Sequence, residues 1–215
     1  MSACAAATGA RLFTARDFRD RANLHRVDEE IGEYGDHRLN PTLKQMLIQQ
    51  ELRDAAVLVP VIDRGDEATV LLTLRSSKLR QHAGQIAFPG GRIDPEDASP
   101  EAAALREAEE EVGLDASFVE TVGRLPYYYT GTGYRVRPVL SIVKPGFLLT
   151  INQDEVDDAF EVPLSFLMNA ENHQRDSRYW QNQRRHFFRM PYQNYNIWGV
   201  TAGIIHMLYE RLYNR

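Results

Sequence analysis

The chain has almost no cysteine, no long hydrophobic run and no excess of positive charge. Cys4 is the only cysteine among 215 residues, which excludes an internal disulfide and a cysteine-based zinc site. No stretch approaches the roughly 18 apolar residues that a membrane span requires. The formal net charge of −5 and the pI of about 5.7 argue against bulk binding of nucleic acid. We therefore expect neither a membrane partner nor a nucleic-acid partner.

We expect neither a signal peptide nor a peroxisomal signal at the ends of the chain; an amphipathic organelle-targeting segment is harder to exclude, although Asp17 and Asp20 count against it. The first residues are small and apolar, but no positively charged region precedes them, so they do not resemble a signal peptide. The last residues, Tyr213-Asn214-Arg215, are not a peroxisomal signal. A cytoplasmic protein is the expectation. The length and the apolar fraction of 43% predict one domain with a self-sufficient core.

Hydrophobic periodicity and turn residues predict a mixed α/β fold. An apolar run over 55–62 and a second run over 68–74, joined by the turn at 63–66, predict a buried strand and its return strand. Other elements are expected elsewhere: helices over 15–24 and 40–53, strands over 118–125, 136–143 and 147–151, a short helix after Pro163, a hairpin of 178–180 with 184–189, and a closing helix over 197–213.

Residues 84–114 contain the candidate site. The turn Pro89-Gly90-Gly91 follows an apolar segment, and its glycines allow the backbone to approach a ligand closely. A helix is predicted from Pro100 to Val112, because Ser99 is a favourable N-cap and Pro100 suits the first helical position. Gly113 suits a left-handed C-terminal cap.

Carboxylates gather at the end of this predicted helix. At about 100° per residue, Glu107, Glu110 and Glu111 share one arc, whereas Glu109 lies off it. Like charges near a helix C-terminus repel one another and oppose the macrodipole. A bound divalent cation would explain them, because Mg²⁺ prefers carboxylate oxygens; a solvated acidic face is the alternative. The arc expected to face the core holds Leu105, Ala108 and Val112.

Together with the glycine turn, this helix resembles the Nudix box, G-x5-E-x7-R-E-U-x-E-E-x-G-U, in which U is aliphatic. The segment REAEEEVGL, from Arg106 to Leu114, matches the second half of the box if Ala108 is taken as the aliphatic residue. The first half departs from it. Asp97 stands where the box has Glu, and eight residues rather than seven separate it from Arg106, which leaves the role of Asp97 open.

The segment upstream resembles the signature of the coenzyme A pyrophosphatase branch, LLT-x-R-S-x3-R-x3-G-x3-F-P-G-G. Residues 71–91 match it at every specified position. This resemblance implies a Nudix-type α/β/α sandwich, with a mixed sheet between helices, over residues 41–215. Residues 1–40 would be a partly helical extension. It also implies hydrolysis of the coenzyme A diphosphate to adenosine 3′,5′-bisphosphate and 4′-phosphopantetheine.

The resemblance assigns roles to the carboxylates and their neighbours. Glu107, Glu111 and Glu110 would hold Mg²⁺ or Mn²⁺, and Arg106 would orient a glutamate. The general base is open between Glu107 and a carboxylate from the acidic stretch 152–158, where Glu155 is the candidate. The candidates for contacts to the substrate are Arg75, Ser76, Arg80, Gly90 and Gly91. For Arg75, Ser76 and Arg80 the alternative role is to lock the loop onto the sheet.

Other functions stay open on the sequence alone. The box is shared by Nudix hydrolases that act on ADP-ribose, NADH or a nucleoside triphosphate. A non-catalytic nucleotide-binding module on the same fold is a further alternative, although such modules usually lose the box carboxylates. The partner expected in each case is a small molecule. The oligomeric state is also open, with a homodimer through the N-terminal helices or the Tyr127–Tyr129 segment as one alternative.

Overall fold

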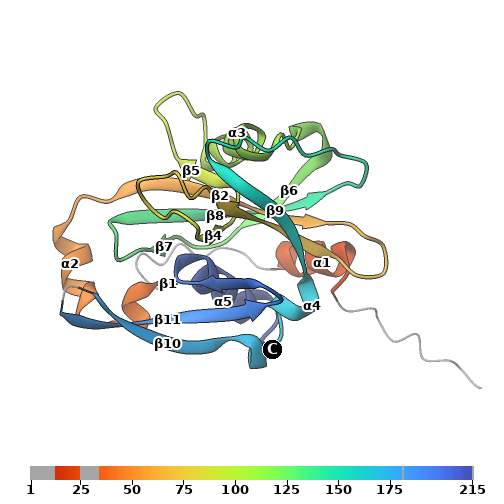
Figure 1. Ribbon diagram of the computed structural model, residues 1–215. Coiled ribbons are helices and arrows are strands. Elements are labelled where there is room, and N and C mark those ends of the chain that lie inside the picture. The colour runs from red at the N-terminus through yellow and green to blue at the C-terminus, as the bar shows by residue number, and fades with distance from the viewer. Residues whose placement is uncertain (1–12, 25–33, 181, 215) are drawn as a thin grey trace, which may run out of the picture.

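The computed structural model describes residues 13–24, 34–180 and 182–214 of the chain (Figure 1). Cys4 and parts of the expected N-terminal extension lie outside the described residues. The described helices are α1 (Ala15–Leu24), α2 (Leu43–Gln49), α3 (Pro100–Val112), α4 (Leu164–Leu167) and α5 (Val200–Leu212), with short 3-10 turns at η1 (Asp36–Arg38), η2 (Ala116–Phe118) and η3 (Ala170–Asn172).

A mixed sheet of nine strands forms the centre of the molecule. Its strands are β1 (Tyr34–Gly35), β2 (Arg53–Ile62), β3 (Thr69–Arg75), β4 (Ile86–Ala87), β5 (Gly90–Arg92), β6 (Val119–Arg124), β7 (Tyr128–Tyr129), β8 (Tyr134–Val143) and β9 (Val156–Pro163). The order is β1-β7-β8-β2-β3-β4, with β5 on β2, β6 on β8 and β9 on β3. The central strands β2 and β8 run parallel, whereas β3 and β9 are antiparallel. Burial of β2 on both faces explains its continuous apolar run.

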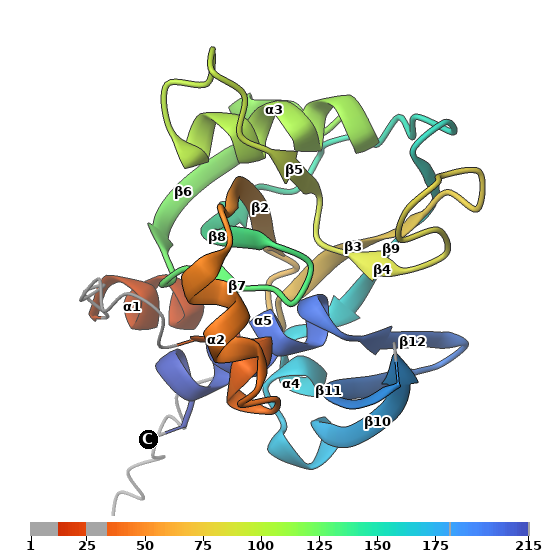
Figure 2. The same ribbon diagram turned by 90° about the vertical axis from the view of Figure 1, so that its left-hand side faces the viewer.

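Helices cover both faces of this sheet, as the α/β/α prediction required. In Figure 1, α3 lies above the sheet, whereas α1 and α5 lie below it. Ala104, Ala108 and Val112 of α3 are fully buried in one core cluster. The other cluster contains Phe18 of α1 and Leu208 of α5. A second sheet, of strands β10 (Gln174–Trp180), β11 (Gln183–Tyr192) and β12 (Tyr195–Trp198), lies beside α5 (Figure 2).

The described N-terminal residues pack into the same structure as the rest of the chain. Phe18 has no exposed surface, and β1 pairs in parallel with β7. Tyr128 and Tyr129 of β7 are themselves buried, so they do not form the exposed aromatic surface that was considered for a dimer. Across the described ranges, no helix has the length and apolar character needed to cross a membrane.

The helix predicted over 40–53 is shorter than expected. It spans only Leu43–Gln49, and Arg53 already belongs to β2. Asn40 does not act as its N-cap. The Asn40 side chain instead donates to the carbonyl of His186 and accepts from the His186 N–H, each at 2.8 Å. Because a strand of the second sheet uses this side chain, the helix begins later.

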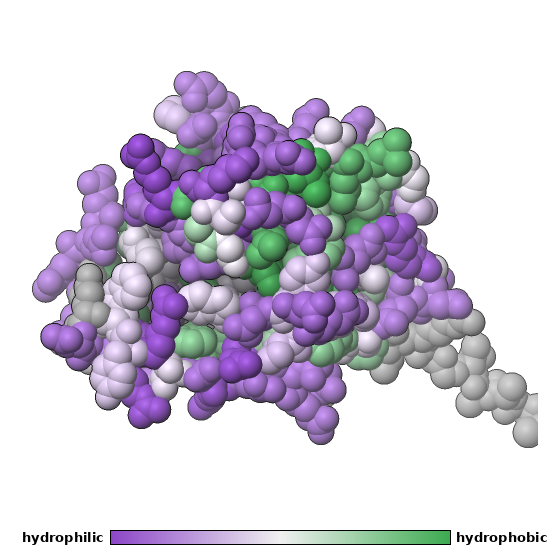
Figure 3. Space-filling view, in the orientation of Figure 1, coloured by the Kyte–Doolittle hydropathy of each residue, from purple (hydrophilic) through white to green (hydrophobic). Residues whose placement is uncertain are grey.

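The strand predicted over 147–151 is wrong. The backbone N–H of Thr150 donates to the carbonyl of Val112, at 2.8 Å, and that of Asn152 to the carbonyl of Glu111, at 3.0 Å. These residues therefore satisfy the open carbonyls at the end of α3 rather than a strand ladder. Leu148 in this loop is 86% exposed. Figure 3 shows apolar side chains gathered on that side of a mostly hydrophilic face.

Two further boundaries differ from the expectation. The end of the acidic stretch and the residues after it form β9, which pairs along the length of β3; its adjacent acids Asp157 and Asp158 obscured the strand pattern. The closing helix begins at Val200 rather than at residue 197, because Ile197 and Trp198 belong to β12. Gly199, with φ of 68°, makes the turn between them.

Candidate active site

The predicted boundaries of the acidic helix are confirmed. The Ser99 side chain accepts a hydrogen bond from the N–H of Ala102, at 3.2 Å, and Pro100 is the first helical residue. Gly113 has φ of 67°, the left-handed conformation expected of the cap. The helix is therefore held rigidly at both ends, and its last turn lies over β5 and β2.

The glycine turn allows that helix to approach the sheet. Gly90 and Gly91 form β5 and pair with Val57 and Ala56 of β2. A Cβ atom on Gly91 would lie 2.5 Å from the carboxyl carbon of Glu107, and one on Gly90 would lie 2.4 Å from the carbonyl oxygen of Ala56. A larger residue would not fit at either position. The two glycines therefore allow the Glu107 carboxylate to lie directly against the sheet.

Glu111 is the most deeply buried of the predicted site carboxylates. It is 1% exposed; one oxygen accepts from the N–H of Gly90, at 3.1 Å, and the other lies 3.4 Å from Nη1 of Arg75. The pKa of Glu111 is raised to about 7: burial is the largest cause, the hydrogen bond from Gly90 and the charge of Arg75 oppose it, and the charges of Glu107 and Glu155 add to it. Negative charge at this position is therefore costly without an additional cation.

Glu107 and Glu110 differ in their surroundings. The side chain of Glu107 is 16% exposed and that of Glu110 is 54% exposed. Burial raises the pKa of Glu107, and the charges of Glu110 and Glu155 add to this effect, whereas Arg106 opposes it. The half-buried carboxylate of Glu107 and the buried one of Glu111 thus lie together against the sheet, while Glu110 stays at the exposed margin. Glu109 is exposed, in keeping with its predicted place off the cluster.

Arg106 connects the loop to the helix. It donates twice to Asp97, at 3.0 Å each, and also to Glu107 at 3.1 Å and Glu110 at 3.0 Å. The Asp97 side chain is only 7% exposed, and its hydrogen bonds to Arg106 lower its pKa. Asp97 also accepts from the N–H of Asp94, at 2.9 Å. The residue whose role the sequence left open is therefore the partner that orients Arg106.

The loop before β9 brings Glu155 to the same site. The N–H of Asn152 bonds to the carbonyl of Glu111, and its side-chain amide lies 3.4 Å from the Glu155 carboxylate. The carbonyl of Glu155 accepts from the N–H of Ser76, at 2.8 Å. Glu155 is thus tied to the ends of both α3 and β3. Sequence reasoning missed Asn152, because nothing in its spacing connects it to the helix.

The predicted substrate-contact residues occupy different environments. Arg75, at the end of β3, reaches Glu111. Ser76 has no exposed surface, and its Oγ lies 3.4 Å from the backbone nitrogen of Lys78, inside the turn. Arg80 is exposed on the loop that leads to β4. Of the three, Arg75 is therefore the one that contacts a predicted site carboxylate.

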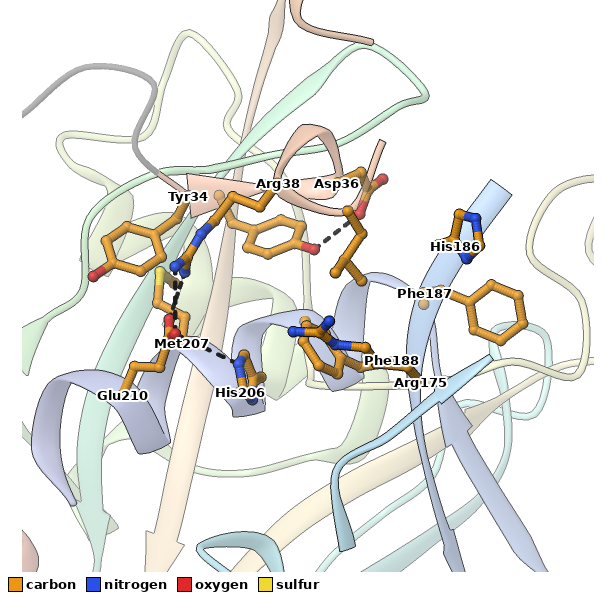
Figure 4. A pocket seen from close by; sticks show the side chains of 15 residues that line it. Tyr34, Asp36, Arg38, Arg175, His186, Phe187, Phe188, His206, Met207 and Glu210 are labelled. Atoms are coloured by element: carbon orange, nitrogen blue, oxygen red, sulfur yellow. Dashed lines mark hydrogen bonds and ion pairs between the residues drawn. The ribbon is translucent and has the colours of Figure 1, made fainter. Parts of the chain in front are cut away.

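A separate cavity of about 130 Å³ lies between β1, η1, the second sheet and α5 (Figure 4). Arg38 and His206 both approach Glu210 there, at 2.5 and 3.6 Å, and Phe188 stacks on His206 with a ring separation of 4.0 Å. None of the site residues predicted from the sequence lines this cavity. The candidate active site and the enclosed cavity are therefore different places.

Comparison with known proteins identifies the family. The NUDIX domain model matches residues 52–184, more than half of the chain. The chain belongs to the Nudix family. The uncharacterized Nudix hydrolase NudL of Escherichia coli K12 is 45% identical over 156 residues, covering 73% of this chain and 81% of NudL. The NudL of Shigella boydii serotype 4 matches at the same identity and coverage.

Solved structures are similar at lower identity. A MutT/nudix family protein from Enterococcus faecalis has a TM-score of 0.47 and 17% identity, covering 82% of this chain and 70% of its own. DR0079 from Deinococcus radiodurans has a TM-score of 0.49 and 12% identity, covering 74% of this chain and 85% of its own. Likenesses at this level carry no argument about function. Family membership supports a Nudix hydrolase that acts on a nucleoside diphosphate derivative.

The donor set fits the divalent cations that Nudix hydrolases generally use. Glu107 and Glu111 present one half-buried and one buried carboxylate beside the backbone of Gly90 and Gly91, and burial raises the pKa values of both, so a cation there would stabilise their charged forms. Within the described part of the chain, no three acidic, histidine or cysteine side chains are grouped closely enough to hold a metal by themselves. This arrangement suits Mg²⁺, which commonly uses one or two carboxylates and takes its other ligands from water and substrate phosphates.

Proposed function

We propose that this Nudix hydrolase cleaves the diphosphate bond of coenzyme A and its derivatives, giving adenosine 3′,5′-bisphosphate and 4′-phosphopantetheine or its acyl form. One observation carries the proposal. Arg75, within the segment that resembles the coenzyme A pyrophosphatase signature, reaches Glu111 of the Nudix helix, at 3.4 Å. The segment that separates this branch from other Nudix hydrolases therefore borders the carboxylates.

We assign the cation ligands to Glu107 and Glu111, with Glu110 at the margin and a carbonyl of Gly90 or Gly91 completing the shell. Mg²⁺ or Mn²⁺ held there would neutralise the diphosphate and favour in-line attack by water. Arg106 keeps Glu107 in place through its own bonds to Asp97. Asp97 is a positioning residue, because its carboxylate contacts Arg106 rather than the carboxylate pair.

Glu155 is proposed as the general base. It is half-buried, and its charge raises the pKa of both Glu107 and Glu111, so its carboxylate lies near theirs. Glu155 would accept a proton from the attacking water, while the bridging oxygen leaves with one phosphate group. Arg75 and Arg80 would contact the phosphates of the substrate, because guanidinium groups bind oxyanions in a bidentate manner.

The substrate assignment is tested by comparing hydrolysis of coenzyme A, ADP-ribose and NADH with Mg²⁺ and with Mn²⁺. Coenzyme A should have the highest kcat/KM, and chromatography should identify the two products named above. Equal or better hydrolysis of ADP-ribose or NADH would reject coenzyme A specificity while leaving the Nudix reaction in place. Binding of nucleotides without turnover would instead indicate a non-catalytic module.

A further inference from the structure

The outer edge of the second sheet is unpaired in the structure. Strand β10 is the first of three strands in the order β10-β11-β12, so only β11 pairs with it among the described strands. Figure 1 shows it at the outer margin of the molecule, on the far side of α5 from the main sheet. Such an edge presents a row of backbone groups that can pair with another strand.

The register shows which backbone groups point outward. Ser177 lies opposite His186 of β11. The N–H and carbonyl of His186 both bond to the side chain of Asn40, on the other side of β11. Ser177 and His186 therefore form a non-hydrogen-bonded pair, and the backbone groups of Ser177 point away from the sheet. By the alternation of a strand, those of Arg175 and Tyr179 point outward as well.

The sequence of β10, QRDSRYW, is self-complementary about Ser177. In an antiparallel pair of two copies centred on Ser177, the outward groups of Arg175 meet those of the partner's Tyr179. Asp176 then lies opposite the partner's Arg178, in a non-hydrogen-bonded pair with Cα atoms about 4.5 Å apart. Opposite charges at such positions stabilise a strand pair.

Charge also excludes the neighbouring registers. Two other registers also pair the outward backbone groups of the two strands. In these registers the two-fold axis passes through Asp176 or through Arg178 instead of Ser177. They place Asp176 against a second Asp176, or Arg178 against a second Arg178, and directly opposed like charges destabilise a strand pair. Arg178 forms no ion pair within the described part of the chain and lies over the ring of Trp198, 4.5 Å from its centroid. It is therefore available to a second copy.

Exposed aromatic side chains accompany this edge. Tyr179 is 78% exposed and Trp180 is 54% exposed, and they are two of the four large hydrophobic residues exposed in the described part of the chain. In the register centred on Ser177, Tyr179 would lie beside the partner's Arg175 and Trp180 beside the partner's Gln174. Both rings would lose contact with water, and Tyr179 would gain a cation–π contact.

We infer that β10 pairs with β10 of a second copy of this chain, about a two-fold axis at Ser177, so that the two small sheets become one sheet of six strands. In the single chain, one oxygen of Asp176 accepts the outward N–H of Ser177, at 2.7 Å, and the other oxygen takes Nη1 of Arg189, at 3.1 Å. Pairing would transfer that N–H to the partner's Ser177 carbonyl and free the first oxygen for the partner's Arg178.

The backbone contact is tested by Ser177→Pro, with Ser177→Ala as the matched control. Proline removes an N–H that has no partner in β11, and proline is accepted at edge strands. The full-length wild-type chain should sediment as a dimer in analytical ultracentrifugation. Ser177→Ala should remain dimeric, whereas Ser177→Pro should sediment as a monomer with unchanged far-UV circular dichroism. A wild-type monomer at every concentration would overturn the proposal, and so would a dimer that survives Ser177→Pro.

The register is tested by a charge exchange. Arg178→Asp places two carboxylates opposite each other at both symmetric positions, so the dissociation constant of the dimer should increase by about tenfold or more. The double variant Asp176→Arg with Arg178→Asp restores opposite charges and should recover the dimer. A fully folded double variant that does not recover would reject this register. Coenzyme A hydrolysis per chain should not change in these variants, because the carboxylates lie on the other side of the main sheet.

Discussion

The active-site carboxylates and the cavity beside α5 are both partly buried and both rich in charge, but their charges are arranged differently. In the cavity, Glu210 faces two nitrogen groups, from Arg38 and His206, and Asp36 accepts from Tyr128 and Gly131. In the candidate active site, burial and the charges of neighbouring carboxylates, Glu155 among them, raise the pKa values of Glu107 and Glu111, and Arg75 and Arg106 oppose these shifts. Glu210 thus has a guanidinium partner of its own, although burial raises the pKa of Asp36 in the same cavity, whereas the site has an excess of negative charge.

The site that we propose is therefore marked by unmet charge rather than by concavity. Burying a carboxylate without a cation costs free energy, so an arrangement of three needs a compensating ligand. A carboxylate with a guanidinium partner, such as Glu210 with Arg38, needs none. The following predictions test this contrast, beginning with the largest expected effect.

Removing one site carboxylate should have the largest effect. Glu107→Gln or Glu111→Gln should each lower kcat by about 100-fold or more, because each removes a charge proposed to hold the cation. Glu109→Gln, on the exposed side of the same helix, should keep its activity, as should Glu210→Gln in the cavity. Steady-state kinetics with Mg²⁺ will measure this. Loss of activity in Glu210→Gln would contradict the assignment of hydrolysis to the carboxylates on α3 rather than to the cavity.

The pH dependence of stability should reveal the excess charge. The pKa of Glu111 is about 7 in the folded chain, against an ordinary value of 4.5. The unfolded chain therefore releases this proton first, and the free energy of unfolding should fall by about 3 kcal/mol as pH rises from 4.5 to 7 in EDTA. Urea unfolding at a series of pH values will measure it. Mg²⁺ and Glu111→Gln should each remove this fall, and an unchanged slope in the variant would contradict the assignment.

Releasing Arg106 should have a moderate effect. Asp97→Ala removes both hydrogen bonds that orient the guanidinium, so kcat should fall by about tenfold, as is typical when a residue that supports metal ligands is lost. KM should change less, because Asp97 does not reach the substrate. The control is Asp94→Ala, whose carboxylate is half exposed and 3.7 Å from Arg106. Equal losses in the two variants would show that Asp97 has no special role.

The cavity should respond to pH in the opposite direction. Burial lowers the pKa of His206 to about 4, from an ordinary 6.5. As pH falls from 6.5 to 4, the unfolded chain gains this proton before the folded chain does, so stability should decrease. His206→Gln should reduce that decrease, whereas His82→Gln on an exposed loop should not. Thermal unfolding of the three proteins over this range gives the comparison.

Local sequence signals predicted the parts of the site that depend on local structure. Ser99, Pro100 and Gly113 determined where α3 begins and ends, because capping involves only neighbouring residues. The apolar run of β2 predicted a buried strand. Strand β9 was missed, because its acidic residues masked the pattern and its pairing with β3 is far away in sequence. The strand predicted over 147–151 was wrong for a similar reason: the backbone partners of these residues belong to α3, which is far away in sequence.

The sequence by itself determined the family, the acidic helix and the glycine turn, since each is a short pattern of residue types. Only the tertiary structure decided which carboxylates matter most. Helical periodicity placed Glu107, Glu110 and Glu111 on one arc, but the packing of α3 against β5 buried Glu111 and left Glu110 exposed. It also placed Asp97 on Arg106 and left the edge of β10 open. The burial and charge compensation of a side chain depend on the residues that pack against its helix or strand, and those residues are distant in sequence.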